Sequence, residues 1–441
     1  MLPLDYLEPL TRNQLLSIGS LALALSTFLV ILVWVSRGSS SLEDSFTVGA
    51  KVNAFLAITL LALNFVLTTR LRLLERAFQG LDRLYKVHKL VGKLVLTFAF
   101  LHLLFLVFKQ LPSGDVWEYL IPGLEWTATL GILSFVFLFV LLLLTLVFRP
   151  PYHLWHMGHR LMFIPLLLAT LHSLLAGSDL AKYPVLRFLV IGICVLGLIS
   201  YIYTLVLYRY LGPRYSAEII GVSRMEGLTE LELRSDPPMG FHAGQFLFVR
   251  FPRFVRVHEM FPFSISNAPG EGTIRISAKK AGDFTSDILP TVKKGDKAVI
   301  MGPYGKFGER FLAHRKDMIW VAGGIGITPF LSMAKQETKE PTGRRIDLVW
   351  SVRDLKDAIY NGDLSNEASA NEDLHHHLWL SGERGRLTGS DIESMIGGRD
   401  DLRRRVIFLC GPTAMMKGIA TQLIHLGAHP RNIIFEDFNL L

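Results

Sequence analysis

Apolar residues of this 441-residue chain gather before about residue 208, in long runs separated by short polar stretches. Six runs are long enough to cross roughly 30 Å of hydrocarbon as helices that rise about 1.5 Å per residue. They cover residues 15–34, 52–69, 90–108, 126–148, 161–175 with its flanks, and 184–207. The pattern predicts six membrane-spanning helices. The first run lacks a small-residue cleavage site, so we interpret it as a span and not as a signal peptide.

From residue 209 on, the pattern changes to short strands and glycine- or proline-containing turns. Strands at 230–234, 245–251 and 274–278 predict a small antiparallel barrel. Apolar strands at 318–322, 346–350 and 406–409 then alternate with helical segments, which predicts a parallel α/β sheet. The predicted fold class is a six-helix transmembrane bundle (1–210), an antiparallel β-barrel domain (211–312) and an α/β nucleotide-binding domain (313–441).

The charge distribution predicts the orientation of the spans. The connection after the second run is crowded with basic residues: Arg70, Arg72, Arg76, Arg83, Lys86 and Lys89. Loops rich in Lys and Arg stay in the cytoplasm. We therefore expect a plasma (inner) membrane protein whose N-terminus and C-terminal half are cytoplasmic, with the loops near Ser39, Ser113 and Ser178 outside. The net charge of +8 then reports topology and lipid contact, and nucleic-acid binding is not expected.

Histidine is costly inside a bilayer, so an intramembrane histidine is a functional candidate. His88 and His102 are 14 residues apart, which puts both on nearly one helix face, about 21 Å apart. His159 and His172 are 13 residues apart, and the rings would need a bend near Pro165 to align. On the expected topology His88 meets His159 near the cytoplasm and His102 meets His172 near the outer face. Such pairs suit the axial positions of two haems.

Other histidines, the cysteines and two neighbouring residues are expected not to bind a metal. His153 and His156 precede the fifth run and are expected at the membrane interface, as is Trp155. Arg160 is either a cation at that interface or a partner for a haem propionate. With two cysteines, neither a disulfide framework nor a cysteine metal cluster is available. The triplet His375, His376 and His377 is expected in a solvated loop.

Two segments of the predicted barrel could hold a flavin. The first is Phe261-Pro262-Phe263-Ser264-Ile265-Ser266-Asn267, where an aromatic and hydroxyls could lie along the ring system. The second continues from Lys279-Lys280-Ala281 into Gly282-Asp283-Phe284-Thr285-Ser286. Backbone N–H groups and hydroxyls at such a helix start could contact a pyrophosphate.

A glycine-rich turn follows the first strand of the α/β domain, with the sequence Gly323-Gly324-Ile325-Gly326-Ile327-Thr328-Pro329. Such a turn lets the backbone approach a diphosphate at a helix start. Ser351 and Arg353 end the next strand and could hold a ribose 2′-phosphate, which favours NADPH, with NADH possible. Cys410, Gly411 and Pro412 follow the last strand, at the edge where open α/β sheets bind ligands.

With these motifs together, the chain resembles the ferric reductase and NADPH oxidase superfamily over nearly its full length. The resemblance rests on the histidine pairs, the Pro-Phe-Ser segment, the glycine-rich turn, Cys-Gly-Pro and the closing Phe435-Glu436-Asp437-Phe438. It implies FAD, two b-type haems and NADPH as cofactors. Catalytic roles are implied for Cys410 at the nicotinamide, Phe438 stacked on the flavin, and Glu436. One departure is Phe261, where relatives often have His or Arg, so a basic FAD contact is missing or is replaced by His258 or Arg256.

The resemblance leaves the electron acceptor open between oxygen and a ferric chelate. The short outer loops lack a dedicated metal-binding cluster, which favours oxygen or a diffusible chelate, and of these we expect oxygen. A redox-silent membrane scaffold or sensor is the alternative from another class. We expect a lipid bilayer and a small-molecule acceptor as partners and, because no EF-hand or regulatory domain is recognisable, no obligatory protein partner.

Overall fold

The computed structural model describes residues 17–36, 44–148, 150, 152–176, 179–212, 214–225, 227–253, 260–280, 282 and 284–436. The chain forms two compact units, one made of Leu15–Gln79 and Arg83–Tyr210, the other including Leu211–Leu441. Each unit is described by itself.

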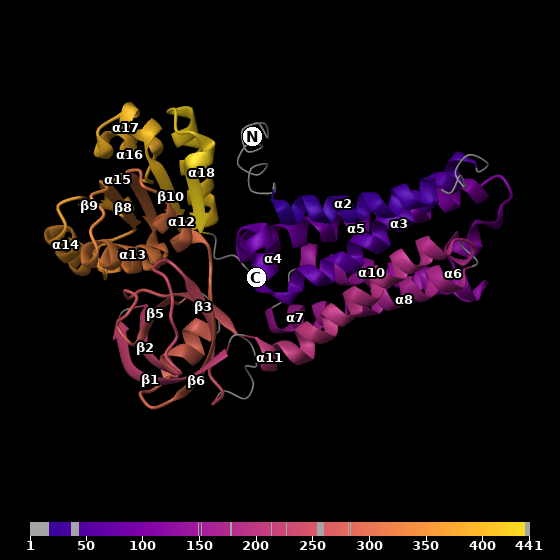
Figure 1. Ribbon diagram of the computed structural model, residues 1–441, viewed down its shortest axis with the longest axis horizontal. Coiled ribbons are helices and arrows are strands. Elements are labelled where there is room, and N and C mark those ends of the chain that lie inside the picture. Colours follow the sequence, from indigo (N-terminus) through magenta and orange to yellow (C-terminus); the bar gives the residue numbers. More distant parts are fainter. Residues whose placement is uncertain are drawn as a thin grey trace. The chain divides into compact units, whose positions relative to one another are not determined.

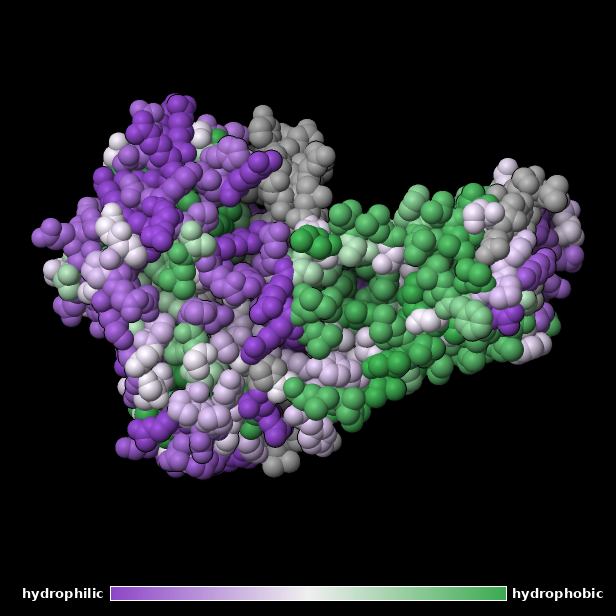
Figure 2. Space-filling model, in the orientation of Figure 1, coloured by the Kyte–Doolittle hydropathy of each residue, from purple (hydrophilic) through white to green (hydrophobic). Residues whose placement is uncertain are grey.

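The first unit is a bundle of long helices (Figure 1). They are α2 (Ile18–Val35), α3 (Ser45–Val66), α5 (Leu81–Gln110), α6 (Trp126–Leu143), α8 (Phe163–Leu175) and α10 (Pro184–Ile202), with short helices α4 (Arg72–Phe78), α7 (Tyr152–Arg160), α9 (Asp179–Lys182) and α11 (Tyr208–Leu211). Six helical segments of the described chain are long and apolar enough to cross a membrane. On the face of this unit that Figure 2 shows, hydrophobic residues form a broad area along the helices, and hydrophilic residues lie at the end of the unit. The predicted six spans are confirmed, and the protein is an integral membrane protein.

Close packing of α3 and α10 depends on a glycine. A Cβ on Gly197 would lie 2.8 Å from the backbone oxygen of Ala62, so only glycine allows the two backbones this approach. Small residues serve this purpose between helices in lipid, where the hydrophobic effect does not drive association.

In the second unit, a six-stranded antiparallel sheet forms the barrel predicted after residue 211. Its strands are β1 (Arg214–Met225), β2 (Leu228–Asp236), β3 (Phe246–Arg250), β4 (Phe261–Ser264), β5 (Ile274–Lys279) and β6 (Lys297–Tyr304), in the order β4-β3-β6-β1-β2-β5. A single bridge between Ile265 and Ile276 joins the two edges. Because side chains alternate along a strand, Leu231 and Ile276 fill the core whereas Glu230 and Ser277 lie on the opposite face.

The remaining chain forms a five-stranded sheet with helices on both faces. Its strands are β7 (Met318–Gly323), β8 (Ile346–Val352), β9 (Leu374–Leu380), β10 (Val406–Cys410) and β11 (Ile433–Glu436), in the order β11-β10-β7-β8-β9. All neighbours run parallel. The helices include α12 (Phe307–Ala313), α13 (Thr328–Lys339), α14 (Asn361–Ala370) and α18 (Thr413–His425). The predicted fold class is confirmed, and the exact domain boundaries stay predictions.

The interpretation of the histidine triplet as a solvated loop is wrong. His375, His376 and His377 lie within β9, which pairs with β8 at the edge of the parallel sheet. The ring of His377 contacts Asp347, with 3.1 Å between Nε2 and Oδ1. Asp347 is fully buried and also binds Arg405. The polar sequence misled because the partner of His377 is a buried carboxylate on the neighbouring strand β8, which the local sequence does not reveal.

Candidate electron-transfer sites

Two of the predicted haem ligands face each other inside the helical unit. The ring centres of His88, on α5, and His159, on α7, are 6.2 Å apart, with the ring planes at 72°. A metal ion bonded at about 2.0–2.1 Å to one nitrogen of each ring would place the ring centres roughly 6 Å apart. The separation therefore fits one metal ion between the two imidazoles.

In three of the four histidines, a hydrogen bond at one ring nitrogen leaves the other ring nitrogen available to bind a metal. The Nδ1 atom of His88 lies 3.3 Å from the backbone oxygen of Asn64, that of His102 lies 2.8 Å from Ala50 O, and that of His172 lies 2.7 Å from Thr127 O. A carbonyl oxygen only accepts, so each Nδ1 carries the hydrogen and each Nε2 keeps its lone pair. Metal-bound histidines are commonly oriented in this way.

The carbonyl groups that hold His88 and His102 come from one helix. Ala50 and Asn64 lie on α3 and are 14 residues apart, which matches the spacing of the two histidines on α5. The later histidine pairs with the earlier α3 residue, so the helices run antiparallel in register. Both rings therefore face one side of α5, about 21 Å apart along its axis.

A break in the fifth span lies between the other two histidines. Helix α7 ends at Arg160 and α8 begins at Phe163. Through the break, Leu161 N bonds to Gly158 O at 3.0 Å and Met162 N to His159 O at 3.1 Å, which are tighter i to i−3 bonds. The helix is therefore wound more tightly at Leu161 and Met162, a few residues before Pro165, where the sequence predicted a bend.

Trp155 has a contact that the sequence did not indicate. Its ring stacks on that of His159, with centres 5.1 Å apart and planes at 22°. His159 Nδ1 is buried and has no hydrogen-bond partner among the described residues. The stacked indole thus restrains the one predicted ligand that lacks a carbonyl partner.

The predicted flavin segment includes β4, at one edge of the barrel sheet. Phe263 and Ile265 point into the core, so Pro262, Ser264 and Ser266 point to the opposite face of the sheet, where Ser264 and Ser266 are themselves buried. Phe261, which stands where relatives often carry a basic residue, stacks on Phe284 with ring centres 3.7 Å apart. Its ring is thus used for packing.

The predicted pyrophosphate segment forms a short turn of helix, Phe284–Ile288. The backbone N–H of Gly282 donates to Thr285 Oγ1 at 3.1 Å, and the backbone N–H of Ser286 donates to Gly282 O at 2.9 Å. Phe284 is buried in the barrel core, so this residue could contact a ligand only through its backbone. Asp283 lies outside the described residues.

The glycine-rich turn joins β7 to α13 against the end of β10. A Cβ on Gly326 would lie 2.4 Å from Cys410 O, and one on Gly323 would lie 2.5 Å from Met415 Cε. Gly324 has a φ of 54°, in the left-handed region that favours glycine. Ile327 and Thr328 follow in the turn, and Pro329 occupies the first turn of α13. The backbone at this helix start is the predicted diphosphate site.

A hollow of about 350 Å³, partly open to solvent, lies beside this turn. It is lined by Gly227, Leu228 and Lys279 of the barrel and by Gly324, Ile325, Ile327, Trp350, Asp357, Ile359 and Tyr360 of the α/β domain. The indole N–H of Trp350 donates to Gly324 O at 2.9 Å and holds the turn in place. The hollow therefore adjoins both the glycine-rich turn and the barrel.

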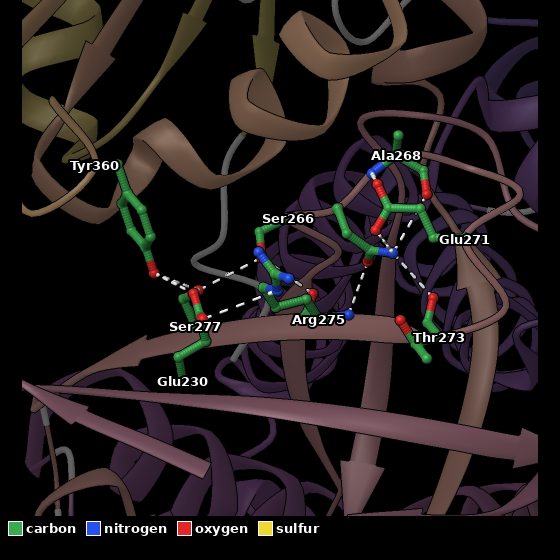
Figure 3. Close-up of polar contacts among 9 residues, drawn as sticks. Glu230, Ser266, Ala268, Glu271, Thr273, Arg275, Ser277 and Tyr360 are labelled. Carbon is green, nitrogen blue, oxygen red and sulfur yellow. Dashed lines mark hydrogen bonds and ion pairs between the residues drawn. The ribbon is translucent and has the colours of Figure 1, made fainter. Parts of the chain in front are cut away.

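Polar contacts fasten the two domains beside the hollow (Figure 3). The Tyr360 hydroxyl reaches the outer face of the barrel, 2.9 Å from Glu230 Oε2 and 2.6 Å from Ser277 Oγ. Burial and the nearby Glu230 carboxylate raise the pKa of Tyr360, so this hydroxyl stays protonated. Lys279 Nζ lies 3.0 Å from Asp357 Oδ1. No sequence pattern indicates these contacts, because they join segments far apart in the chain.

The remaining predicted residues lie at the carboxyl edge of the parallel sheet. Ser351 is the last residue but one of β8. The side chain of Arg353, just after the strand, is 83% exposed and is therefore accessible to a phosphate. Cys410 ends β10 and is fully buried, while Glu436 ends β11 and is also buried. Gly411 and Pro412 follow Cys410 and lead into α18. Phe438 lies outside the described residues.

The comparisons with known proteins agree with these units. Residues 53–170 match a family model described as ferric reductase like transmembrane component. Residues 221–318 match an FAD-binding domain, and residues 320–421 match an oxidoreductase NAD-binding domain. Three of the four predicted haem ligands fall within the first match, which ends two residues before His172.

Curated relatives match just under half of the chain. Flavohemoprotein A of Dictyostelium discoideum is 29% identical over 211 residues, covering 45% of this chain and 52% of the relative. The flavohemoprotein of Bacillus subtilis is 26% identical over 226 residues, covering 46% of this chain and 53% of the relative. The chain spans about half the length of these curated relatives. A flavohemoglobin structure from Malassezia yamatoensis, 16% identical, gives a TM-score of 0.49 over 80% of this chain and 98% of that one, which adds nothing to the assignment.

Six apolar spans joined to FAD-binding and NAD-binding domains define a membrane flavoenzyme oxidoreductase. Within that class, residues 53–170 belong to the ferric reductase like transmembrane components, and they are followed by an FAD-binding domain and an oxidoreductase NAD-binding domain.

Proposed function

We propose that this protein passes electrons from cytoplasmic NADPH through FAD and two b-type haems to oxygen on the outer face of the plasma membrane. The observation that carries the proposal is the facing pair of His88 and His159, with ring centres 6.2 Å apart. Each of the four histidines would supply one axial nitrogen, in the pairs His88 with His159 and His102 with His172. When bound, FAD accepts a two-electron hydride and haem iron accepts single electrons, so the cofactors connect the two kinds of chemistry.

The soluble unit would hold the two nucleotides by different means. The turn at Gly323, Gly324 and Gly326 would bind the NADPH diphosphate through its backbone, and Arg353 would meet the 2′-phosphate as a charged donor. The outer face of β4, with Pro262 and Ser264, would lie along the flavin. Tyr360 and Lys279 keep the barrel and the α/β domain together beside the hollow, which supports a fixed distance between the two nucleotides.

Oxygen is proposed as acceptor because the described residues contain no group of three or more metal-binding side chains that could hold an iron ion. Ferric chelate is the second candidate, and the name of the matched transmembrane family favours it. We also propose that NADPH oxidation requires no second protein.

The acceptor is tested with the purified full-length protein in detergent, supplied with FAD and NADPH. Cytochrome c reduction is measured with and without superoxide dismutase, beside reduction of a ferric chelate under nitrogen. A mainly dismutase-sensitive signal supports oxygen as acceptor. Efficient chelate reduction that persists with dismutase and without oxygen supports the second candidate instead. NADPH oxidation that begins only after a second protein is added contradicts the proposal of independence.

A further inference from the structure

A buried polar cluster near one end of the helical unit plays no part in the sites described so far. Asp179, the first residue of α9, accepts hydrogen bonds from Trp34 Nε1 of α2 at 2.6 Å and from Lys51 Nζ of α3 at 2.9 Å. The Asp179 side chain is 4% exposed and that of Lys51 is 25% exposed. Trp34 is among the most deeply buried large side chains of the described chain.

The charges of this cluster are costly to bury. Removing a carboxylate and an ammonium group from water costs several kcal/mol per ion, and their attraction often does no more than repay that. Lys51 lies within the second candidate span, where an ionisable residue is a functional candidate by default, and Asp179 lies in the connection before the sixth span.

The position of Lys51 suggests what the charges act on. Lys51 directly follows Ala50, whose carbonyl accepts the Nδ1–H of His102 at 2.8 Å. Adjacent Cα atoms are about 3.8 Å apart, so the backbone of Lys51 lies next to the group that orients His102. The other ligand on α5, His88, precedes His102 by 14 residues and lies about 21 Å from it along the helix axis.

We propose that Asp179 neutralises Lys51 beside the haem held by His102 and His172, so that the reduction potential of this haem is kept at its value only while the two charges balance. The inference rests on the proposed function, because it requires that haem to be bound. A positive charge near a haem favours the reduced iron and raises the potential, and a negative charge lowers it. Both effects are strong where water is excluded and fall with distance. The paired charges offset each other at the haem of His102 and act only weakly on the other haem.

The test is a potentiometric titration of the purified full-length holoprotein, followed through the optical bands of reduced haem. His102→Leu first identifies which titration step belongs to the outer haem. Lys51→Met leaves the carboxylate uncompensated and is expected to lower the potential of that step, whereas Asp179→Asn is expected to raise it. The double variant is expected to return close to the wild-type value. The step of the other haem is expected to shift less in every variant.

Two controls separate charge from structure. Trp34→Phe removes a hydrogen bond to the same carboxylate without changing any charge, so the outer step is expected to move less than in either charge variant. Lys109→Met removes a charge from the end of α5, seven residues from His102, where the side chain is exposed and water screens it. If Asp179→Asn does not accumulate, Lys51→Met and the charge-preserving Lys51→Arg carry the comparison.

The titration distinguishes a failure of the charge-pair inference from a failure of the proposed function. Two haems with wild-type spectra whose potentials do not respond to Lys51→Met or Asp179→Asn overturn the charge-pair inference alone. Shifts of the same sign in both variants also overturn it. A wild-type protein that binds no haem overturns the proposed function.

Discussion

The imidazole rings are oriented by backbone carbonyls in three of the four predicted haem ligands. A carbonyl cannot be removed by substitution, so the ligand itself is the residue to change. His88→Leu is expected to lower the haem content of the purified protein from two per chain to one, because one axial ligand is lost. The ratio is measured from the pyridine haemochrome spectrum.

His156 offers a control one helical turn before His159. Since it is not expected to bind iron, His156→Leu is expected to retain two haems per chain. A full haem complement in His88→Leu, or loss of one in His156→Leu, would contradict the ligand assignment.

The β9 histidines give the soluble unit a dependence on pH. Burial lowers the pKa of His376 to about 4, from an ordinary value of about 6.5. An unfolded chain binds a proton at this residue below about pH 6.5, and the folded chain does not until about pH 4. The stability contributed by neutral His376 is therefore present above pH 6.5 and is lost as the pH falls toward 4.

Thermal unfolding of the full chain, followed by tryptophan fluorescence at pH 7 and pH 5, tests this effect. His376→Phe is expected to reduce the loss of midpoint temperature between the two pH values. His375→Gln removes a histidine from the same strand and is expected to leave the loss close to wild type. An unchanged pH dependence in His376→Phe would show that other groups cause it.

At the scale of elements, helix α6 makes room for one predicted ligand. A Cβ on Gly131 would lie 3.1–3.2 Å from three ring atoms of His172. Gly131→Val adds two further carbons at that point and is expected to displace the ring and lose the outer haem. Gly192→Val on α10 is the matched control, because a Cβ there has nothing within 4 Å. The haem content of both variants is measured from their optical spectra. Retention of both haems in Gly131→Val would contradict the assignment of His172 as a haem ligand.

Elements that depend on local sequence were predictable, and contacts between distant segments were not. The spans, the glycine-rich turn and the parallel strands follow from hydropathy, from glycine at a required left-handed position and from apolar runs. The carbonyls of Ala50 and Asn64 carry no sequence signal, because every residue has one. Tyr360 likewise reaches Glu230 across 130 residues. The triplet around His376 was wrongly expected in a loop because its pairing with β8, and the contact of His377 with Asp347, join segments about 30 residues apart.

For the whole molecule, the distribution of Lys and Arg predicts which side of the membrane each loop faces. The described native cysteines, Cys194 and Cys410, are both buried, so added cysteines can report the topology. In intact cells, Ser113→Cys in the connection after α5 is expected to react with a membrane-impermeant maleimide. Gln79→Cys, in the basic connection, is expected to react only after the membrane is permeabilised. The reverse pattern would place the soluble unit outside.

The central claim is that electrons from NADPH enter the membrane unit through FAD and reach histidine-bound haems. Its most direct test is an anaerobic optical titration of the purified, FAD-loaded full chain with NADPH, in the absence of any acceptor. The account predicts that the flavin absorbance falls and that the reduced-haem bands of both haems appear. Bleaching of the flavin while the haem bands remain oxidised, or a preparation without haem bands, would contradict it.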